Sequence, residues 1–290
     1  MADAGLHHMT HPGPVHPTRI EWARGQITEL SQDQVGAGMS LRDAISALVA
    51  KTGHTSGTGR FQGSFSSFRF TTGGPARDGK AANYTYIRDI DTSSGLVDVR
   101  FTFGLDGDDN CFVHAHGHFR ETLSGGEQGG HLFPDDCRIE RCDQLEVCAV
   151  EGLLLRQQPD NETLHSVFEI EKGGASGDGL FVRVRPNEDL PTALAYAIAE
   201  VGAGNATSVN SIGSLNQPYV DEKDGTSRKI DHVGMEITSM GVLVYGSPNE
   251  TIANVAVQAV DADGIHHYGV LTKGASSVCV TAEVLLRITG

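Results

Sequence analysis

Two stretches of the chain place apolar residues at helical spacing. They are LRDAISALVAKTG at 41–53 and LPTALAYAIAEVG at 190–202, and each ends at a glycine. The apolar stripe consists of Leu41, Ile45, Leu48 and Val49 in the first and of Leu194, Ala197, Ile198 and Val201 in the second. Spacings of three and four residues predict an amphipathic helix in each stretch, and glycine suits the position just beyond a helix C-terminus.

Alternating apolar and polar residues follow each predicted helix. They form LVDVRFTFG at 96–104 and GMEITSMGVLVYG at 234–246, and the closing runs LEVCAVEGLLL at 145–155 and SVCVTAEVLLRI at 277–288. A period of two predicts strands, and the short turns between them favour antiparallel pairing. The expected fold class is therefore α+β, with two similar domains that are each a mostly antiparallel β-sheet flanked by helices.

The same order of predicted elements occurs twice along the chain. A Gly-Ser pair lies between helix and strands at 63–64 and again at 213–214, which is 150 residues later. A repeat of this length indicates a duplicated domain, because solenoid units are much shorter. We expect a mobile tail rich in His and Pro at 1–24, a first domain at 25–156, and a linker with the second domain at 157–290. The run VFEIE at 167–171 is expected to be the second domain's first strand.

Composition narrows the class of protein. The 290 residues carry a net charge of −15, and the 22 Lys and Arg are scattered, which disfavours DNA as a partner because DNA affinity depends on neutralising phosphates. No apolar run is long enough to span a membrane, and the first residues lack a secretion signal, so we expect a cytoplasmic protein. The five cysteines form an odd set without C-x-x-C spacing, which favours reduced thiols.

Four histidines gather in CFVHAHGHFRETLSGGEQGGHL at 111–132. Alternate residues of a strand share one face, about 6.5 to 7 Å apart, so two imidazoles at this spacing can bind one ion. Three protein ligands and an open fourth position are typical of catalytic zinc. We predict a metal site formed by His114, His116 and His131, with His118 as the alternate ligand. The other interpretation is a row of surface histidines on a solvent-facing strand.

The H-x-H pair and the G-G-H-L turn that follows it resemble the plant and prokaryote conserved (PPC) domain family. The matching residues are His114, His116, Gly129, Gly130, His131 and Leu132. The resemblance implies an antiparallel sheet flanked by helices and a trimeric assembly. Plant members of the family join this domain to an AT-hook that enters the DNA minor groove, and this sequence has no such segment. The two glycines either form a turn or let the backbone approach a bound ligand closely.

The second half departs from this motif. In the family spacing, the positions of the three histidines are taken by Asn254, Ala256 and Val270. His266 and His267 adjoin the turn, but neighbouring strand residues point to opposite faces, so we interpret them as solvated turn residues. A fold requirement would have kept the imidazoles in both halves, which favours a binding role for the first set.

Carboxylates near the motif are candidates for proton transfer or for orienting an imidazole. We predict Glu151 and Glu127 for these roles, and Asp135 and Asp136 are the other acidic residues close in sequence. Glu151 sits in an apolar strand, where a carboxylate needs a partner. Its counterpart Glu283 lies in the half without the motif, so a structural pairing explains Glu151 as well as catalysis does.

The function we expect is a metal-dependent one. Zinc or another divalent metal in the N-terminal half would bind a small polar or anionic molecule, which the protein either senses or converts as a lyase or hydrolase. Among the tail histidines, His11 is the one most able to reach the site. The chain is expected to self-associate. A DNA-binding regulator and a non-catalytic trimerisation module are the alternatives.

Overall fold

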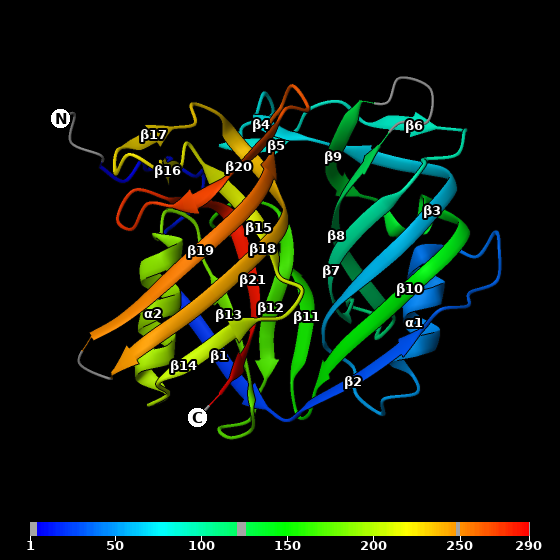
Figure 1. Cartoon of the computed structure of the whole chain (residues 1–290), viewed down its shortest axis with the longest axis horizontal. Coiled ribbons are helices and arrows are strands. Elements are labelled where there is room, and N and C mark those ends of the chain that lie inside the picture. The colour runs from blue at the N-terminus through cyan, green and yellow to red at the C-terminus, as the bar shows by residue number, and fades with distance from the viewer. Residues whose placement is uncertain (1–4, 121–125, 248–249, 290) are drawn as a thin grey trace.

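The computed structural model of the chain describes residues 5–120, 126–247 and 250–289, which form mostly antiparallel β-sheet with two α-helices (Figure 1). Helix α1 spans Leu41–Val49 and α2 spans Leu190–Glu200, as predicted. The side chain of Ser40 caps α1 and that of Asp189 caps α2, each accepting a backbone N–H three residues later. Gly53 and Gly202 follow the helices at φ of 74° and 68°, where glycine is favoured.

The first of two large sheets, called here the N-terminal sheet, has the strand order β12-β11-β7-β8-β9-β3-β10-β2, and β6 also pairs with β3. Its strands are β2 (Ile27–Gln32), β3 (Gly57–Thr71), β6 (Arg88–Ile90), β7 (Val97–Leu105), β8 (Cys111–Arg120), β9 (Glu127–Leu132), β10 (Arg138–Val150), β11 (Leu154–Pro159) and β12 (Ser166–Lys172), and a 3-10 turn, η1, spans Pro134–Asp136. Helix α1 packs against β10, and the core between them is rich in phenylalanine.

The second, called the C-terminal sheet, has the order β1-β13-β21-β14-β18-β19-β20-β16-β17, and β15 pairs with β18 and β21. Its strands are β1 (Ile20–Gly25), β13 (Gly179–Val184), β14 (Asn205–Ser208), β15 (Ile212–Asn216), β16 (Tyr219–Asp221), β17 (Ser227–Lys229), β18 (Val233–Ser247), β19 (Glu250–Val260), β20 (His266–Leu271) and β21 (Ser277–Ile288). Helix α2 packs against β19. A small sheet of β4 (Gly73–Pro75) and β5 (Ala82–Tyr84) lies beside the two large ones.

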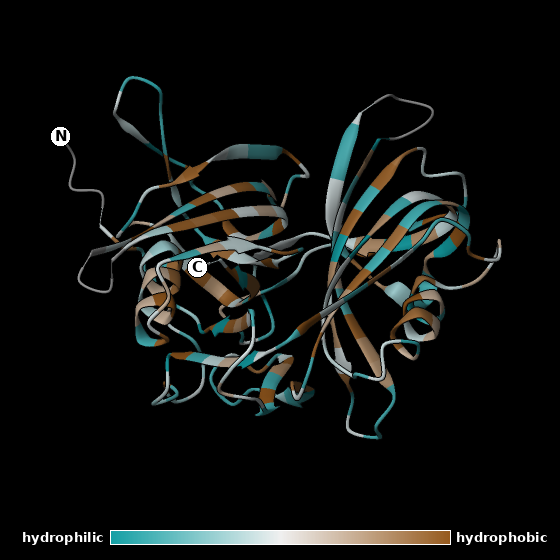
Figure 2. Cartoon of the chain, turned by 60° about the horizontal axis from the view of Figure 1, so that its bottom comes forward, coloured by the Kyte–Doolittle hydropathy of each residue, from teal (hydrophilic) through white to brown (hydrophobic). Residues whose placement is uncertain are grey.

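Several strands show the alternation expected from the sequence, with bands of brown and teal along their ribbons (Figure 2), whereas β13 and β15 are buried at every position. The order in which the strands pair is also similar in the two sheets. Strand β10 lies between β2 and β3, as β21 lies between β13 and β15, and β7 to β9 form a meander as β18 to β20 do. The hairpin β8–β9, which carries the histidine motif, therefore has the same place in its sheet as β19–β20 has in the other.

The two sheets exchange one edge strand each. Strand β1, from the beginning of the chain, pairs along its whole length with β13 of the C-terminal sheet. Strand β12, the predicted first strand of the second domain, pairs instead with β11 of the N-terminal sheet. The VFEIE run therefore forms a strand but not in the expected sheet, and the predicted boundary between residues 24 and 25 falls inside β1.

A buried cluster of charges lies where the exchanged strands meet. The guanidinium of Arg183 on β13 is 3.1 Å from Glu21 on β1 and 2.8 Å from Glu169 on β12. Arg185 lies 2.9 Å from Glu169 and 3.3 Å from Asp160. Both arginine side chains are only 1% exposed, so each needs these carboxylates. The cluster thus ties together one strand from each exchanged edge.

The tail predicted to be mobile packs along the C-terminal sheet in the described residues from Gly5 onward. The backbone N–H of Met9 donates to the Asn187 side chain at 2.7 Å, and that of Gly13 donates to the Glu162 carbonyl at 3.0 Å. The five cysteines are free thiols, as predicted. Neither of the two described helices has the length and apolar character needed to cross a membrane.

Candidate metal centre between the two sheets

Three predicted histidines converge where the N-terminal sheet faces the C-terminal sheet. His114 and His116 share one face of β8, and His131 on β9 is paired directly with His116. One ligand nitrogen from each ring lies within 4.8 Å of the others. The ring centroids are 4.7 Å apart for His114 and His116, and 5.2 and 5.4 Å from these two to His131. The alternation along one strand and the register with the next account for this convergence.

Hydrogen bonds from the opposite sheet orient two of the imidazoles. Nδ1 of His116 lies 3.0 Å from the carbonyl oxygen of Ile237 on β18, which can only accept. Nδ1 of His114 lies 3.1 Å from the carboxylate of Glu283 on β21. Both Nδ1 atoms therefore carry hydrogen, which directs the Nε2 atoms toward the centre. These two Nε2 atoms are 3.1 Å apart.

Burial and neighbouring charges together set the pKa values of the three imidazoles. Burial lowers the pKa of His114, but Glu283 outweighs it and holds that pKa above its ordinary value. Burial keeps the pKa of His116 and of His131 well below the usual range, and the charge of His114 lowers both further. These two rings are therefore neutral near pH 7, the form that binds metal ions.

A second carboxylate from β18 reaches the same point. One oxygen of Glu236 lies 3.2 Å from Nε2 of His116, and burial raises the pKa of Glu236 to about 7. On the other side, the hydroxyl of Tyr84 on β5 lies 3.1 Å from Nε2 of His131. The centre is thus enclosed by groups from both large sheets and from the small one.

These groups line a cavity of about 60 Å³, which is space for a few water molecules. Its polar walls also include Asn83, His165, Ser214 and Thr281, and its remaining lining residues are Gly73, Ala82, Ser166, Val167, Gly213, Gly234, Cys279 and Val280. The lining contains no Lys or Arg.

The other residues predicted for the site lie elsewhere. His118 points toward His266, with ring centroids 6.4 Å apart, and is not part of the cluster. Glu127 is exposed and contacts Tyr268, and Glu151 is exposed in the turn after β10. Asp135 and Asp136 are exposed and pair with arginines. Gly129 and Gly130 are buried in β9 close to neighbouring backbone, outside the cavity lining. Among the tail residues, His11 does not line the cavity.

Sequence reasoning missed Glu236 and Glu283 because both come from the second half of the chain. One signal was available: Glu283 sits in an apolar strand and therefore needs a partner. That partner is His114, more than 160 residues away, and no spacing rule connects the two. Tyr84 lies in the first half but was also missed, because β5 is a three-residue strand and its contact with His131 spans 47 residues.

The second half shows the predicted loss of the motif, with one correction. Ala256 pairs with Val270 as His116 pairs with His131, so the equivalent positions carry no imidazole. His266 and His267, however, are not solvated turn residues, because both are partly buried and lie on β20. Nδ1 of His266 lies 3.2 Å from the side-chain nitrogen of Gln258, and Nε2 of His267 lies 2.7 Å from a carboxylate oxygen of the buried Asp261. Adjacent strand residues do point to opposite faces, but one of those faces holds a buried partner.

Comparison with known proteins gives similarity to one family. The family model of the Plants and Prokaryotes Conserved (PCC) domain matches residues 171–289. The histidine motif lies outside that range. No protein in the curated set matches the sequence.

Several solved structures cover about half of this chain. A metal-containing protein from Archaeoglobus fulgidus has 18% identity and a TM-score of 0.40, covering 52% of this chain and 97% of its own. A plant- and prokaryote-conserved protein from Pyrococcus horikoshii has 19% identity and a TM-score of 0.39, with coverage of 54% and 97%. A provisionally assigned DNA-binding protein from Bacteroides thetaiotaomicron has 10% identity and a TM-score of 0.38, with coverage of 53% and 99%. The chain is thus similar, over its C-terminal part, to the PCC domain family.

Proposed function

We propose that His114, His116 and His131 bind one divalent metal ion and present it to a small polar molecule in the cavity. The observation that carries the proposal is the contact between the Nε2 atoms of His114 and His116 at 3.1 Å. With hydrogen on both Nδ1 atoms, this contact requires a proton or a metal ion between the two Nε2 atoms, and the Glu236 carboxylate adds a third acceptor at the same point. Such a group of acceptors favours a cation at its centre.

The donor set suits zinc or a similar ion. Three imidazoles with one open position are typical of catalytic zinc. The hydrogen bond that Nδ1 of His114 donates to Glu283 is the carboxylate contact that commonly orients a metal-binding imidazole. A metal ion bound there would polarise a substrate oxygen or lower the pKa of a water molecule.

The chain's own groups would handle the proton. Glu236 has a pKa raised to about 7 by burial, which suits a group that takes up and releases a proton at neutral pH. The Tyr84 hydroxyl and the side chains of Ser214 and Thr281 offer hydrogen bonds to a small molecule. Because the lining contains no Lys or Arg, we propose a small polar ligand with at most one anionic group, bound through the metal.

Metal analysis of the purified protein tests this proposal. We expect His116→Ala and His131→Ala to lose one equivalent of metal relative to the unaltered chain. The matched control is His118→Ala, which alters the next histidine on the same strand face and should keep the full content. If His114 instead shares a proton with His116, all of these proteins will contain the same amount of metal, and the proposal fails.

The alternative is DNA binding, which the name of the Bacteroides thetaiotaomicron protein suggests for that relative. A protein that contacts phosphates binds DNA tightly at low salt and loses affinity steeply as salt rises. With a net charge of −15, this chain is expected to show no such binding. A salt titration of DNA binding therefore separates the two functions.

We also infer that the two halves descend from one duplicated domain. The support is the shared order of pairing and the equivalent register of His116 with His131 and of Ala256 with Val270. In this view one copy kept the metal ligands. The other copy supplies Glu236 and Glu283, which complete the first copy's site.

A further inference from the structure

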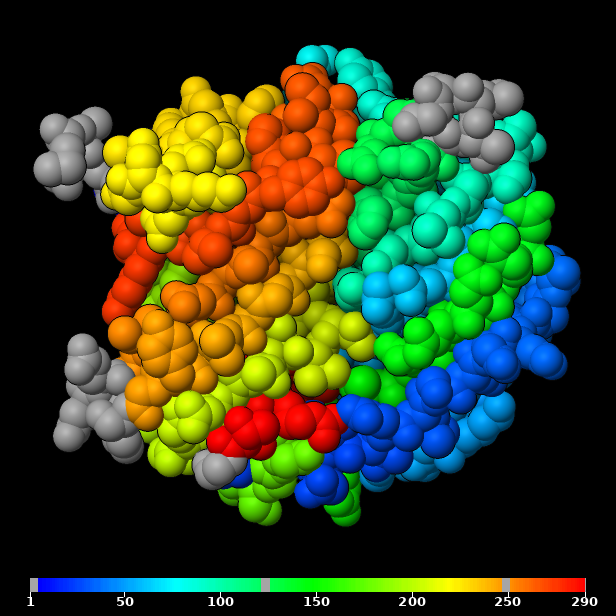
Figure 3. Space-filling model, in the orientation of Figure 1, coloured from blue at the N-terminus to red at the C-terminus, as the bar shows by residue number. Residues whose placement is uncertain are grey.

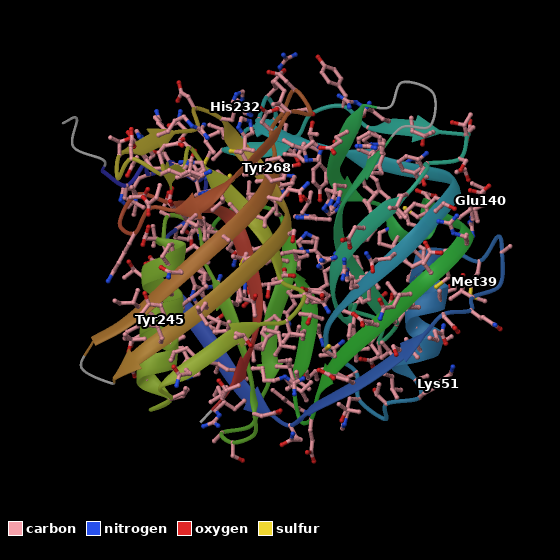
Figure 4. The ribbon with its side chains drawn as sticks, viewed as in Figure 1. Met39, Lys51, Glu140, His232, Tyr245 and Tyr268 are labelled. Carbon is pink, nitrogen blue, oxygen red and sulfur yellow. The ribbon has the colours of Figure 1, made fainter. Side chains whose placement is uncertain are left out.

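A second group of metal-ligand type lies outside the cavity. It consists of His232, just before β18, Asp261, just after β19, and His267 on β20, and one ligand atom of each lies within 4.8 Å of the others. The same oxygen, Oδ2 of Asp261, is 2.7 Å from Nε2 of His267 and 3.3 Å from Nε2 of His232. Figure 4 labels His232 at the end of the C-terminal sheet that lies at the top of the view.

The backbone holds Asp261 in place without using the oxygen that faces the imidazoles. Its Oδ1 accepts the backbone N–H groups of Asp263 at 2.9 Å and Ile265 at 3.0 Å, which close the turn between β19 and β20. The Asp261 side chain is fully buried, whereas those of His267 and His232 are 17% and 33% exposed. The carboxylate is therefore fixed, and the imidazole side of the group is open to solvent.

A carboxylate oxygen has two lone pairs, and both imidazoles aim an Nε2 atom at Oδ2 of Asp261. Two imidazoles and one carboxylate on one side of an ion, with the other positions open, form a set typical of first-row divalent metals. Zinc holds such ligands at about 2.0 to 2.2 Å, which places neighbouring ligand atoms about 3.3 Å apart. The ligand atoms of the three side chains lie within 4.8 Å of one another, so small side-chain movements would bring them to that spacing.

We infer that His232, Asp261 and His267 form a second divalent metal site, separate from the first and not equivalent to it. Val270 occupies the position on β20 that corresponds to His131, so duplication of the first site does not explain this group. The charged groups next to it include Asp231, which pairs with Lys229 at 2.7 Å, Asp263 in the turn, and Arg88, near Gly264. Lys229 is already paired with Asp231, so it does not neutralise Asp261, and a cation at this group would meet little repulsion.

The site lies where the C-terminal sheet meets β3 and β4. The carbonyl of Ala262, next to Asp261, accepts the Thr72 hydroxyl at 3.1 Å. Gly73 approaches Gly234, two residues after His232, so closely that a Cβ on Gly73 would lie 2.1 Å from the Gly234 carbonyl oxygen. An ion at this site would fix the loop before β18 to the β19–β20 turn. We therefore expect it to stabilise the contact between the two sheets.

Calorimetric titration with Zn²⁺ tests the inference. The full chain is first freed of metal with a chelator, and its fold is checked by circular dichroism. We expect two equivalents of zinc for the unaltered chain, and one for His267→Ala with an affinity loss of at least 100-fold at the altered site. Asp261→Asn should have the same effect, and its amide oxygen can still accept the two backbone N–H groups of the turn.

The matched control is His266→Ala, which removes the neighbouring imidazole on the opposite face of β20 and should keep two equivalents. If His267→Ala and Asp261→Asn both bind as much zinc as the unaltered chain, the second site is wrong. His116→Ala separates this inference from the proposed function, because it should leave the second site as the one remaining. If the first site is wrong and the second right, the unaltered chain binds one equivalent and His267→Ala binds none.

Discussion

Single hydrogen bonds decide what the histidine cluster can do. The Ile237 carbonyl accepts a hydrogen bond from Nδ1 of His116, and the Glu283 carboxylate accepts one from Nδ1 of His114. Each bond directs the Nε2 atom of its ring toward the centre. An imidazole that is free to rotate loses binding strength, because it must be ordered when the ion arrives. The β21 carboxylate is therefore as much a part of the site as the β8 imidazoles are.

Replacing Glu283 tests this contribution. Glu283→Gln removes the charge that orients His114, and we expect zinc affinity at the first site to fall about 10- to 100-fold. The measurement is a competition titration against a chromophoric chelator. Glu151→Gln is the control, because Glu151 is the sequence counterpart in the N-terminal half and lies exposed in a turn. Equal affinities for the two variants would exclude the orienting role.

The thiols also differ at the residue scale. Burial raises the pKa of Cys137 and of Cys148 to about 12, so almost none of either thiol is ionised at pH 8. Cys142 is only partly buried and its pKa is raised less. We expect iodoacetamide at pH 8 to modify Cys142 well before Cys137 and Cys148, as read by peptide mass spectrometry. Equal labelling of all three in the folded protein would contradict the buried positions.

Much of the candidate site follows from local sequence. The two-residue spacing of His114 and His116 places them on one strand face whatever the rest of the fold, and the antiparallel pairing of β9 with β8 brings His131 beside them. Glu236, Glu283 and Asp261 could not be assigned in this way. Their partners lie on the opposite sheet or beyond a loop. The position of one sheet against another depends on the sum of many contacts.

At the scale of elements, the exchange of edge strands is the main departure from the sequence-based expectation. The helices and the central strands were predictable from periodicity, because one face of each is buried. An edge strand has only one hydrogen-bonded neighbour, and nothing in its own pattern names that neighbour. Glu21 on β1 and Glu169 on β12 both pair with Arg183 on β13, and these ion pairs favour the observed positions of the two edge strands.

Loss of one buried arginine should therefore weaken the whole fold. Arg185→Leu leaves Glu169 and Asp160 with one cation fewer, and removing one partner of a buried ionic group costs about 3 kcal/mol. We expect a drop of this size in the free energy of unfolding, measured with urea. The control is Arg228→Leu, whose half-exposed pair with Glu222 should contribute about 1 kcal/mol or less. A change below that in Arg185→Leu would contradict a structural role for the cluster.

At the scale of the whole molecule, one sheet face is covered and its equivalent is open. The face that carries His114, His116 and His131 packs against β18 and β21. The corresponding face of β18 to β20 is exposed, and its apolar residues include Leu243, Tyr245, Tyr268 and Val270, at 51%, 41%, 54% and 38% exposure. Figure 3 shows these strands, in orange, at the surface, and Figure 4 labels Tyr245 and Tyr268 on them.

We propose that a second copy of the chain covers this open face, because the equivalent face is covered by the same kind of sheet within one chain. Sedimentation velocity at micromolar concentration should then show a mass above 30.8 kDa, and Leu243→Glu should lower it to the monomer. Val15→Glu changes a more exposed apolar residue of the tail, at 70% exposure, and should leave the assembly intact. A monomeric unaltered chain would exclude self-association through this face.

The exchange of the edge strands β1 and β12 also determines how the chain can be divided into fragments. A fragment ending near residue 160 would keep β1 without the sheet it belongs to and would leave β11 without a neighbour on one side. The remaining fragment would carry β12 unpaired and expose the edge of β13. Unpaired edges attract other strands, so two such pieces should be poorly behaved alone and should recover a native assembly only when mixed.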